Sequence, residues 1–258
     1  MDMRWKAGGI SVAGFAHIDE GIPCQDAHAF ETRDDGWFVA AVADGAGSAA
    51  KSHTGAQAYV SSVVSYFATQ PELPSMAEDV MAAAFIREID ATTRRLVEAD
   101  GDEPVNLSKS DFAATVIMVV CHQEGGAFFH VGDGAGVALK LSDMALSVVS
   151  KPENGEYANE TYFVTMDGWE EHLRVTAFDS TFDTVILMSD GATPMAMTKG
   201  CEAPFPEFVR PVINFLQKAA PENGVAALRN TLTRDQVRTI TGDDKTLVWA
   251  LKPLSPEA

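Results

Sequence analysis

The sequence has few positive charges and few cysteines. Lys and Arg number 19 against 37 Asp and Glu, which gives a formal net charge of −18 at pH 7. An acidic chain without a basic run repels nucleic acid and anionic lipid, so we exclude both as partners. The 3 cysteines are an odd number without metal-site spacing, and we interpret them as reduced thiols of a cytoplasmic protein.

Long apolar runs are also absent. The longest apolar stretch, Phe112–Cys121, is shorter than the roughly 20 residues that a bilayer-crossing helix needs. The first residues lack the apolar core region of a signal peptide, so neither a membrane span nor export is expected. The sequence contains no repeat, low-complexity tract or long linker, and 46% of it is apolar. We therefore predict one domain over residues 1–258 with a sizeable core.

The apolar residues change their period along the chain. Helical spacing predicts helices over 49–68, 75–99, 205–219 and 222–237, the second with a capping box of Ser75 and Glu78. Short β-type runs predict strands over 5–15, 26–32, 36–43, 112–121, 127–131, 137–141, 146–149, 162–165, 173–177, 184–188 and 245–251. The alternation that a parallel sheet needs is absent. The prediction is an α+β fold with two stacked, mainly antiparallel sheets flanked by helices, a four-layer α-β-β-α sandwich.

Carboxylates occur where several of these strands begin or end. A single Asp-Gly is usually a turn, but here two apolar strands each end in Asp-Gly and an Asp-Asp pair precedes a third. Carboxylates that meet at one point repel one another unless hard cations neutralise them, and oxygen-only ligands favour Mg²⁺ or Mn²⁺ over zinc. The acidic residues at strand ends are Asp26, Asp44, Asp111, Asp190, Asp243 and Asp244.

Six short motifs contain these carboxylates, in a fixed order along the chain. They are GFAH at 14–17 with PCQDA at 23–27, VADGAGS at 42–48, DFAAT at 111–115, VGDG at 131–134, MSDG at 188–191 and GDDKT at 242–246. Each motif alone is weak, but together they cover nearly the whole chain. In this order the sequence resembles the metal-dependent protein Ser/Thr phosphatases of the 2C type, in a bacterial branch of that family.

The resemblance implies two tightly bound Mn²⁺ or Mg²⁺ ions at one end of the sandwich. On this basis Asp44 would bridge the ions, and the carbonyl of Gly45 would ligate one of them. Asp190 and Asp243 would hold the other ion. Asp111 would pair with Asp190 at a third, weaker ion. The strand-end pattern independently supports Asp44, Asp190 and Asp243.

The resemblance is incomplete where phosphate would bind. Gly21 replaces an Arg that many family members use for phosphate, and Ala46 replaces a frequent His. His17 is therefore a candidate for phosphate binding or for catalytic proton donation, with a structural hydrogen bond as the alternative. Ser48 is a candidate phosphate ligand at a helix start, or a simple helix cap. Asp133 is predicted to be a tight-turn residue rather than a ligand.

The function implied is hydrolysis of phosphoserine and phosphothreonine in proteins, by a hydroxide that bridges the two ions. Asp26 would hydrogen-bond metal-bound water. The cysteines lack the Cys-x₅-Arg pattern of a nucleophilic phosphatase. A phosphorylated protein and its cognate Ser/Thr kinase are the expected partners in bacterial signalling. Two alternatives stay open: a catalytically weak, phosphatase-like regulatory or phosphoprotein-binding module, suggested by Gly21 and Ala46, and a hydrolase of small phosphoesters.

Overall fold

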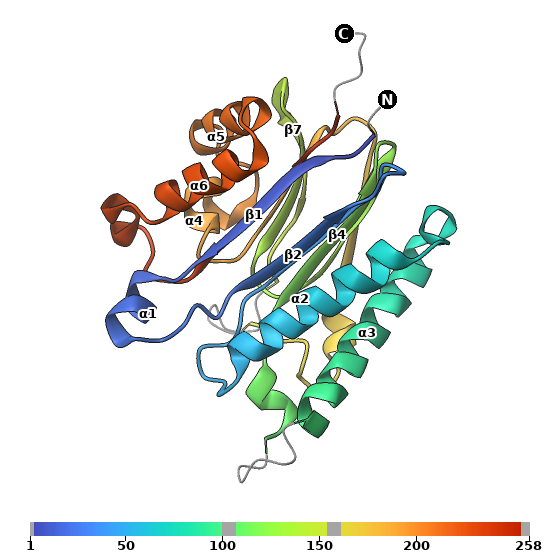
Figure 1. Ribbon diagram of the computed structural model, residues 1–258, viewed down its shortest axis with the longest axis vertical. Helices are drawn as coiled ribbons and strands as arrows, with labels where there is room; N and C mark the ends of the chain where they lie inside the picture. The colour runs from blue at the N-terminus through green and yellow to red at the C-terminus, as the bar shows by residue number, and fades with distance from the viewer. Residues whose placement is uncertain (1–2, 100–106, 154–160, 254–258) are drawn as a thin grey trace.

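The computed structural model describes residues 3–99, 107–153 and 161–253, which form two five-stranded sheets stacked face to face (Figure 1). All strand pairs within the two sheets are antiparallel. One sheet has the order β1 (Lys6–Val12), β10 (Lys245–Leu251), β9 (Thr184–Met188), β6 (Ala135–Lys140) and β7 (Asp143–Ser150). The other has the order β2 (Ala27–Thr32), β3 (Phe38–Ala43), β4 (Val116–His122), β5 (Gly125–Val131) and β8 (Arg174–Asp179).

Helices cover the outer faces of both sheets (Figure 1). The sheet that contains β3 is covered by α2 (Ser52–Thr69) and α3 (Glu78–Ala99). The sheet that contains β10 is covered by α4 (Thr193–Ala196), α5 (Pro206–Lys218) and α6 (Pro221–Leu232). None of the helices in the described residues is long and apolar enough to span a membrane.

Strand β3 illustrates how the layers are held together. Every residue of this strand is buried, which explains its uninterrupted apolar sequence. Because side chains alternate along a strand, Phe38, Ala40 and Val42 join the cluster between the sheets. Val39 and Ala41 face the other way, into the cluster under α2 and α3. Because β3 is apolar throughout, it contributes side chains to the core on both faces of its sheet.

Four local predictions differ from the structure. The first strand ends at Val12, and α1 (Phe15–Glu20) follows it. Ser75 does not cap α3, because its hydroxyl donates to the carbonyl of Glu72 within a short 3₁₀ helix. Residues 109–112 form another 3₁₀ helix, so the strand predicted from residue 112 begins only at β4. Residues 162–165 contain no strand, although Val164 is buried there.

Candidate metal centre

Carboxylates from both sheets converge at one end of the sandwich. Asp44 follows β3, Asp190 follows β9, and Asp133 lies in the turn through which the chain crosses from β5 to β6. Each offers an oxygen that lies within 4.8 Å of the oxygens of the other two. Strand ends of two stacked sheets thus bring together residues that are far apart in the sequence.

A cavity of about 280 Å³ opens beside this cluster. Mostly polar and small residues from seven separate segments of the chain line it, and His17 is its one lining side chain, among the described residues, that can carry a positive charge. The residues are His17, Gln25, Asp44, Gly45, Ala46, Gly47, Thr115, Asp133, Thr161, Phe163 and Asp243. The cavity is small and acidic, which suits hydrated divalent cations and a phosphate group.

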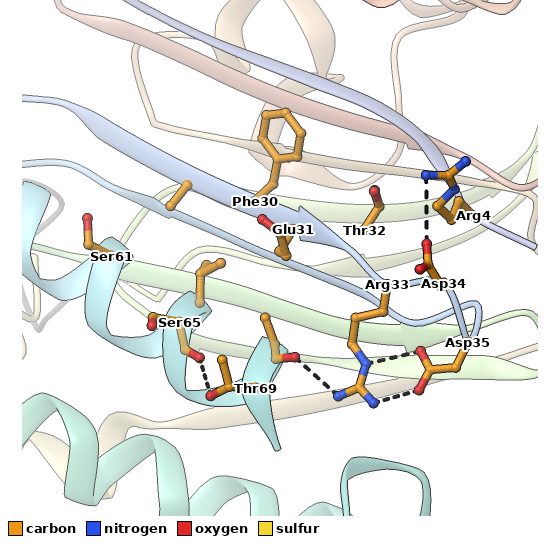
Figure 2. A pocket seen from close by; sticks show the side chains of 13 residues that line it. Arg4, Phe30, Glu31, Thr32, Arg33, Asp34, Asp35, Ser61, Ser65 and Thr69 are labelled. Carbon is orange, nitrogen blue, oxygen red and sulfur yellow. Dashed lines mark hydrogen bonds and ion pairs between the residues drawn. The ribbon is translucent and has the colours of Figure 1, made fainter. Parts of the chain in front are cut away.

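A larger cavity, of about 1080 Å³, lies between β2 and α2 (Figure 2). It contains none of the clustered carboxylates. Its Arg33 is fully engaged, because the guanidinium meets Asp35 at 2.5 Å and donates to the carbonyls of Ala68 and Gln70. The smaller cavity, beside the clustered carboxylates, is therefore the candidate site.

Burial changes the ionisation of the clustered carboxyl groups. Burial is the largest cause that raises the pKa of Asp26 to about 7 and the pKa of Asp190 to about 6. Burial also raises the pKa of Asp44 well above its usual range, and the charges of Asp26 and Asp190 add to the effect. Three acids that resist ionisation at one place indicate a site that a bound cation would stabilise.

The unsatisfied atoms at this place fit a cation. The Oδ1 atoms of Asp26, Asp133 and Asp190 are buried and have no hydrogen-bond partner within the described residues. Buried polar atoms are normally paired, so such a group of orphaned oxygens calls for a ligand. Oxygen donors that are hard and anionic suit Mg²⁺ or Mn²⁺.

The structure distinguishes Asp243 from its neighbour Asp244. Asp243 is exposed and lines the cavity. Asp244 is 2% exposed and accepts hydrogen bonds from the backbone N–H of Gly14 at 2.6 Å, from that of Gln25 at 2.5 Å, and from Nδ1 of His17 at 2.9 Å. Asp244 therefore links the motif at 242–246 to the motif at 14–17 and 23–27 by hydrogen bonds.

The first motif is fitted closely around this tie. A Cβ on Gly14 would lie 2.3 Å from the carbonyl carbon of Asp243, so only glycine allows the two segments to pack. Because Nδ1 of His17 faces Asp244, the other ring nitrogen is left for the cavity that the imidazole lines. The predicted site residue His17 is thus brought to the carboxylate cluster.

Asp26 lies behind the cluster. Its side chain is 7% exposed, and Oδ2 accepts a hydrogen bond from Ser189 Oγ at 2.7 Å. Ser189 Oγ in turn accepts from the backbone N–H of Thr246 at 2.9 Å. The carboxyl group is therefore fixed to both the strand end before Asp190 and the start of β10.

Two predicted site residues, Ser48 and Asp111, lie away from the carboxylate cluster and the cavity, and one residue that was not predicted as a ligand lies in the cluster. Ser48 is exposed and does not line the cavity, and α2 starts only at Ser52. The carboxylate of Asp111 caps its own 3₁₀ helix, where Oδ2 accepts from the N–H and the hydroxyl of Ser108 at 2.8 and 2.9 Å. Asp133 joins Asp44 and Asp190 instead, from the turn between β5 and β6 in which the sequence places it. Its motif VGDG at 131–134, at a crossing between sheets, was the available signal.

The chain thus has two stacked antiparallel sheets and an acidic cavity at one end of them, and comparisons with known proteins give its family. The protein phosphatase 2C family matches residues 13–233 of the chain. Serine/threonine-protein phosphatase 3 of Escherichia coli (strain K12) is 30% identical over 257 residues, which are 96% of this chain and 99% of that protein.

Two solved structures share the fold. The serine/threonine phosphatase Stp1 from Staphylococcus aureus has a TM-score of 0.66 and 11% identity, with 97% of this chain and 96% of that chain covered. The catalytic domain of the serine threonine protein phosphatase PstP in complex with 2 manganese ions has a TM-score of 0.62 and 15% identity, with 96% and 98% covered. The chain belongs to the protein phosphatase 2C family, whose members are phosphoprotein phosphatases. The predicted family and the predicted α+β sandwich are both confirmed.

Proposed function

We propose that this chain hydrolyses phosphoserine and phosphothreonine in proteins and uses Mn²⁺ or Mg²⁺ bound at the carboxylate cluster. The observation that carries the proposal is the meeting of Asp44, Asp133 and Asp190, with oxygens within 4.8 Å of one another. The test is an assay of a phosphoserine peptide and of small phosphoesters, each with and without Mn²⁺. Turnover of the peptide only with metal supports the proposal, and binding without turnover indicates a regulatory module instead.

Two ions would be held by Asp44, the carbonyl of Gly45, Asp190 and Asp243, with Asp44 between them. In this proposal Asp133 takes the role that the resemblance gave to Asp111, as a partner of Asp190 at a third, weaker ion. Such ions acidify bound water, polarise a phosphoryl group and orient it for in-line attack.

Hydrogen bonds within the chain fix the position of Asp44, the carboxylate at the centre of the proposed site. Thr115, the residue before β4, holds the backbone of Asp44, because the N–H of Thr115 donates to the Asp44 carbonyl at 2.8 Å. The N–H of Asp44 donates to Thr115 Oγ1 at 3.1 Å. The N–H of Gly45 donates to the carbonyl of Gln25 at 3.2 Å, which ties this loop to the first motif. The buried Asp26 supplies an acceptor behind the cluster for a water or a proton.

His17 would contact the phosphate or protonate the leaving oxygen. Its lining position and its bond to Asp244 support a role in catalysis. A cytoplasmic location and a cognate Ser/Thr kinase stay predictions from the sequence.

Metal should stabilise the folded chain, and more so at higher pH. Burial raises the folded-state pKa of Asp26 to about 7 and that of Asp190 to about 6, against about 4 when unfolded. Between these values the unfolded chain has lost protons that the folded chain keeps, so these groups lower the stability of the metal-free protein as pH rises. Cations bind the ionised carboxylates and reverse this loss.

We therefore expect Mn²⁺ to raise the melting temperature over that in EDTA by more at about pH 7.5 than at about pH 5. Differential scanning calorimetry with EDTA and with Mn²⁺ at both pH values measures this. Asp26→Asn is the matched variant, in which the metal-free protein should lose less stability with rising pH. A melting temperature indifferent to metal at both pH values would contradict the site.

Asp133 should matter for metal binding and Asp111 should not. Asp133→Asn replaces one oxygen of the cluster by a neutral amide, so we expect the Mn²⁺ concentration for half-maximal activity to rise about tenfold. Asp111→Asn is the matched control, because that carboxylate caps a short helix outside the cavity. Activity measured against Mn²⁺ concentration for both variants shows which of the two residues supports metal binding. An effect of Asp111→Asn alone would favour Asp111, as the resemblance implies, as the partner of Asp190.

A further inference from the structure

The turn that carries Asp133 is held by residues outside the cavity. Gly132, Asp133 and Gly134 make the crossing from β5 to β6. Gly132 has a φ of 117°, and a Cβ there would lie 2.5 Å from the side chain of Thr115. Position 132 therefore requires glycine in this positive-φ conformation. The hydrogen bonds of the turn then determine where Asp133 lies.

Two donors converge on the carbonyl of Gly132. Nη2 of Arg174 donates to it at 3.0 Å, and the backbone N–H of Glu153 donates to it at 3.1 Å. Nη1 of Arg174 also donates to Oε2 of Glu153 at 2.5 Å, so the guanidinium links the turn to Glu153. Arg174 stands opposite His130 in the pairing of β5 with β8, which places it beside the turn.

Glu153 also contacts His172, whose ring stacks on that of Tyr162. Its Oε1 lies 3.4 Å from Nδ1 of His172, in the 3₁₀ helix Trp169–His172 before β8. The ring of Tyr162 stacks on that of His172 with 3.4 Å between centroids and 14° between planes. The neighbour of Tyr162 is Thr161, whose hydroxyl donates to Oδ2 of Asp133 at 2.5 Å.

These contacts restrain Asp133 from both ends. The carbonyl of Gly132 and the amide of Asp133 belong to one planar peptide unit. Two donors on that carbonyl therefore fix the plane from which the Asp133 side chain departs, and Thr161 restrains the carboxylate itself. Oδ1 of Asp133 is the oxygen that has no partner in the described part of the chain.

We propose that Arg174 and Glu153 are positioning residues for the metal centre, which hold the Gly132 carbonyl and so set the Asp133 carboxylate toward a divalent cation. The proposal rests on the proposed metal-dependent function. Neither residue lines the cavity, so both act through the turn. Outer partners of metal ligands typically change metal affinity by about 10- to 100-fold when they are mutated.

The test measures Mn²⁺ binding to the full chain by calorimetric titration, together with electron paramagnetic resonance of free Mn²⁺. We expect Arg174→Met, which keeps the apolar stem, to weaken the weakest Mn²⁺ binding step by about tenfold. Arg174→Lys keeps the charge but loses the two-pronged geometry, so it should weaken the same step. Arg94→Met, on the exposed side of α3, is the matched control and should change nothing.

A double-mutant cycle separates positioning from general structural support. If Arg174 acts through Asp133, Arg174→Met has no further effect on Mn²⁺ affinity in the Asp133→Asn background. Equal effects in both backgrounds, or unchanged Mn²⁺ binding in Arg174→Met, would overturn the proposal. Should Arg174→Met fail to fold by circular dichroism, Glu153→Gln replaces it, with the same expectation of a selective loss.

The failure of the proposed function is distinguishable from the failure of this inference. A wild-type chain that binds no Mn²⁺ overturns the metal centre and the positioning role with it. If the wild-type chain binds Mn²⁺ and Arg174→Met binds it equally tightly, the positioning role alone is overturned.

Discussion

Asp44→Asn should lower kcat for a phosphoserine peptide by about 10³-fold and abolish tight Mn²⁺ binding. Asp44 is the carboxylate proposed to lie between two ions, and oxygens of Asp190 and Asp133 lie within 4.8 Å of its own. Asparagine has the same shape but no charge, so it removes electrostatic attraction for both ions. A bound metal contributes several kcal/mol of transition-state stabilisation, which corresponds to the expected loss in rate.

The same substitution should have the opposite effect on the metal-free protein. Burial and neighbouring carboxylates raise the pKa of Asp44 well above its usual range, so its ionised form destabilises the fold when no cation is present. Asp44→Asn should therefore melt at a higher temperature than wild type in EDTA at neutral pH. This trade of stability against activity is typical of functional sites.

Three measurements test the role of Asp44: kcat at saturating Mn²⁺, calorimetric titration with Mn²⁺, and melting in EDTA. Asp34→Asn is the matched control, because that side chain is 95% exposed and its ion pair with Arg4 is long, at 3.7 Å. It should leave all three measurements unchanged. Wild-type Mn²⁺ affinity in Asp44→Asn would remove this residue from the centre.

Most of the fold was predictable because burial leaves a direct mark on composition. A strand covered on both faces, such as β3, must be apolar throughout, and that pattern does not depend on its partners. Residues 162–165 show the limit of this signal. Val164 is buried and its N–H donates to the carbonyl of Ala114 at 3.0 Å, yet no strand pairs there. Periodicity reports which side chains are buried, and it does not report pairing.

The site was predictable where several strands repeat one pattern. Asp44 and Asp190 each end an apolar strand before a Gly, and Asp243 precedes one, so their convergence could be argued from strand ends. Asp133 sits between two glycines, and a turn was the ordinary interpretation. It is a turn, and the crossing between sheets also brings its carboxylate within 4.8 Å of those of Asp44 and Asp190. Only the three-dimensional packing of the two sheets reveals that proximity.

Asp111 shows why a residue type in the expected place is not enough. Its direction is set by Ser108, three residues earlier, in a capping box that satisfies both partners locally. The serine was visible in the sequence and was a signal for a cap. A long-range ligand role needs the side chain to be free of such a local partner, as it is for Oδ1 of Asp133 and of Asp190.

His17→Gln should lower kcat for a phosphoserine peptide by about 10²-fold while Mn²⁺ binding stays at the wild-type level. His17 lines the cavity, and its Nδ1 is held 2.9 Å from the buried carboxylate of Asp244. A ring fixed through Nδ1 presents Nε2 in one orientation, as a proton donor must. Glutamine keeps a polar side chain of similar reach but cannot donate a proton to a developing alkoxide.

The choice of substrate distinguishes the two roles of His17. The alkoxide of serine is a poor leaving group and needs a proton, whereas p-nitrophenolate leaves without one. If His17 donates the proton, the loss in kcat should be large for the peptide and small for p-nitrophenyl phosphate. If His17 binds the phosphate, both substrates should lose kcat/KM to the same degree. His53→Gln, on an exposed turn of α2, is the matched control, and wild-type kinetics of His17→Gln with both substrates would leave the bond to Asp244 as a purely structural one.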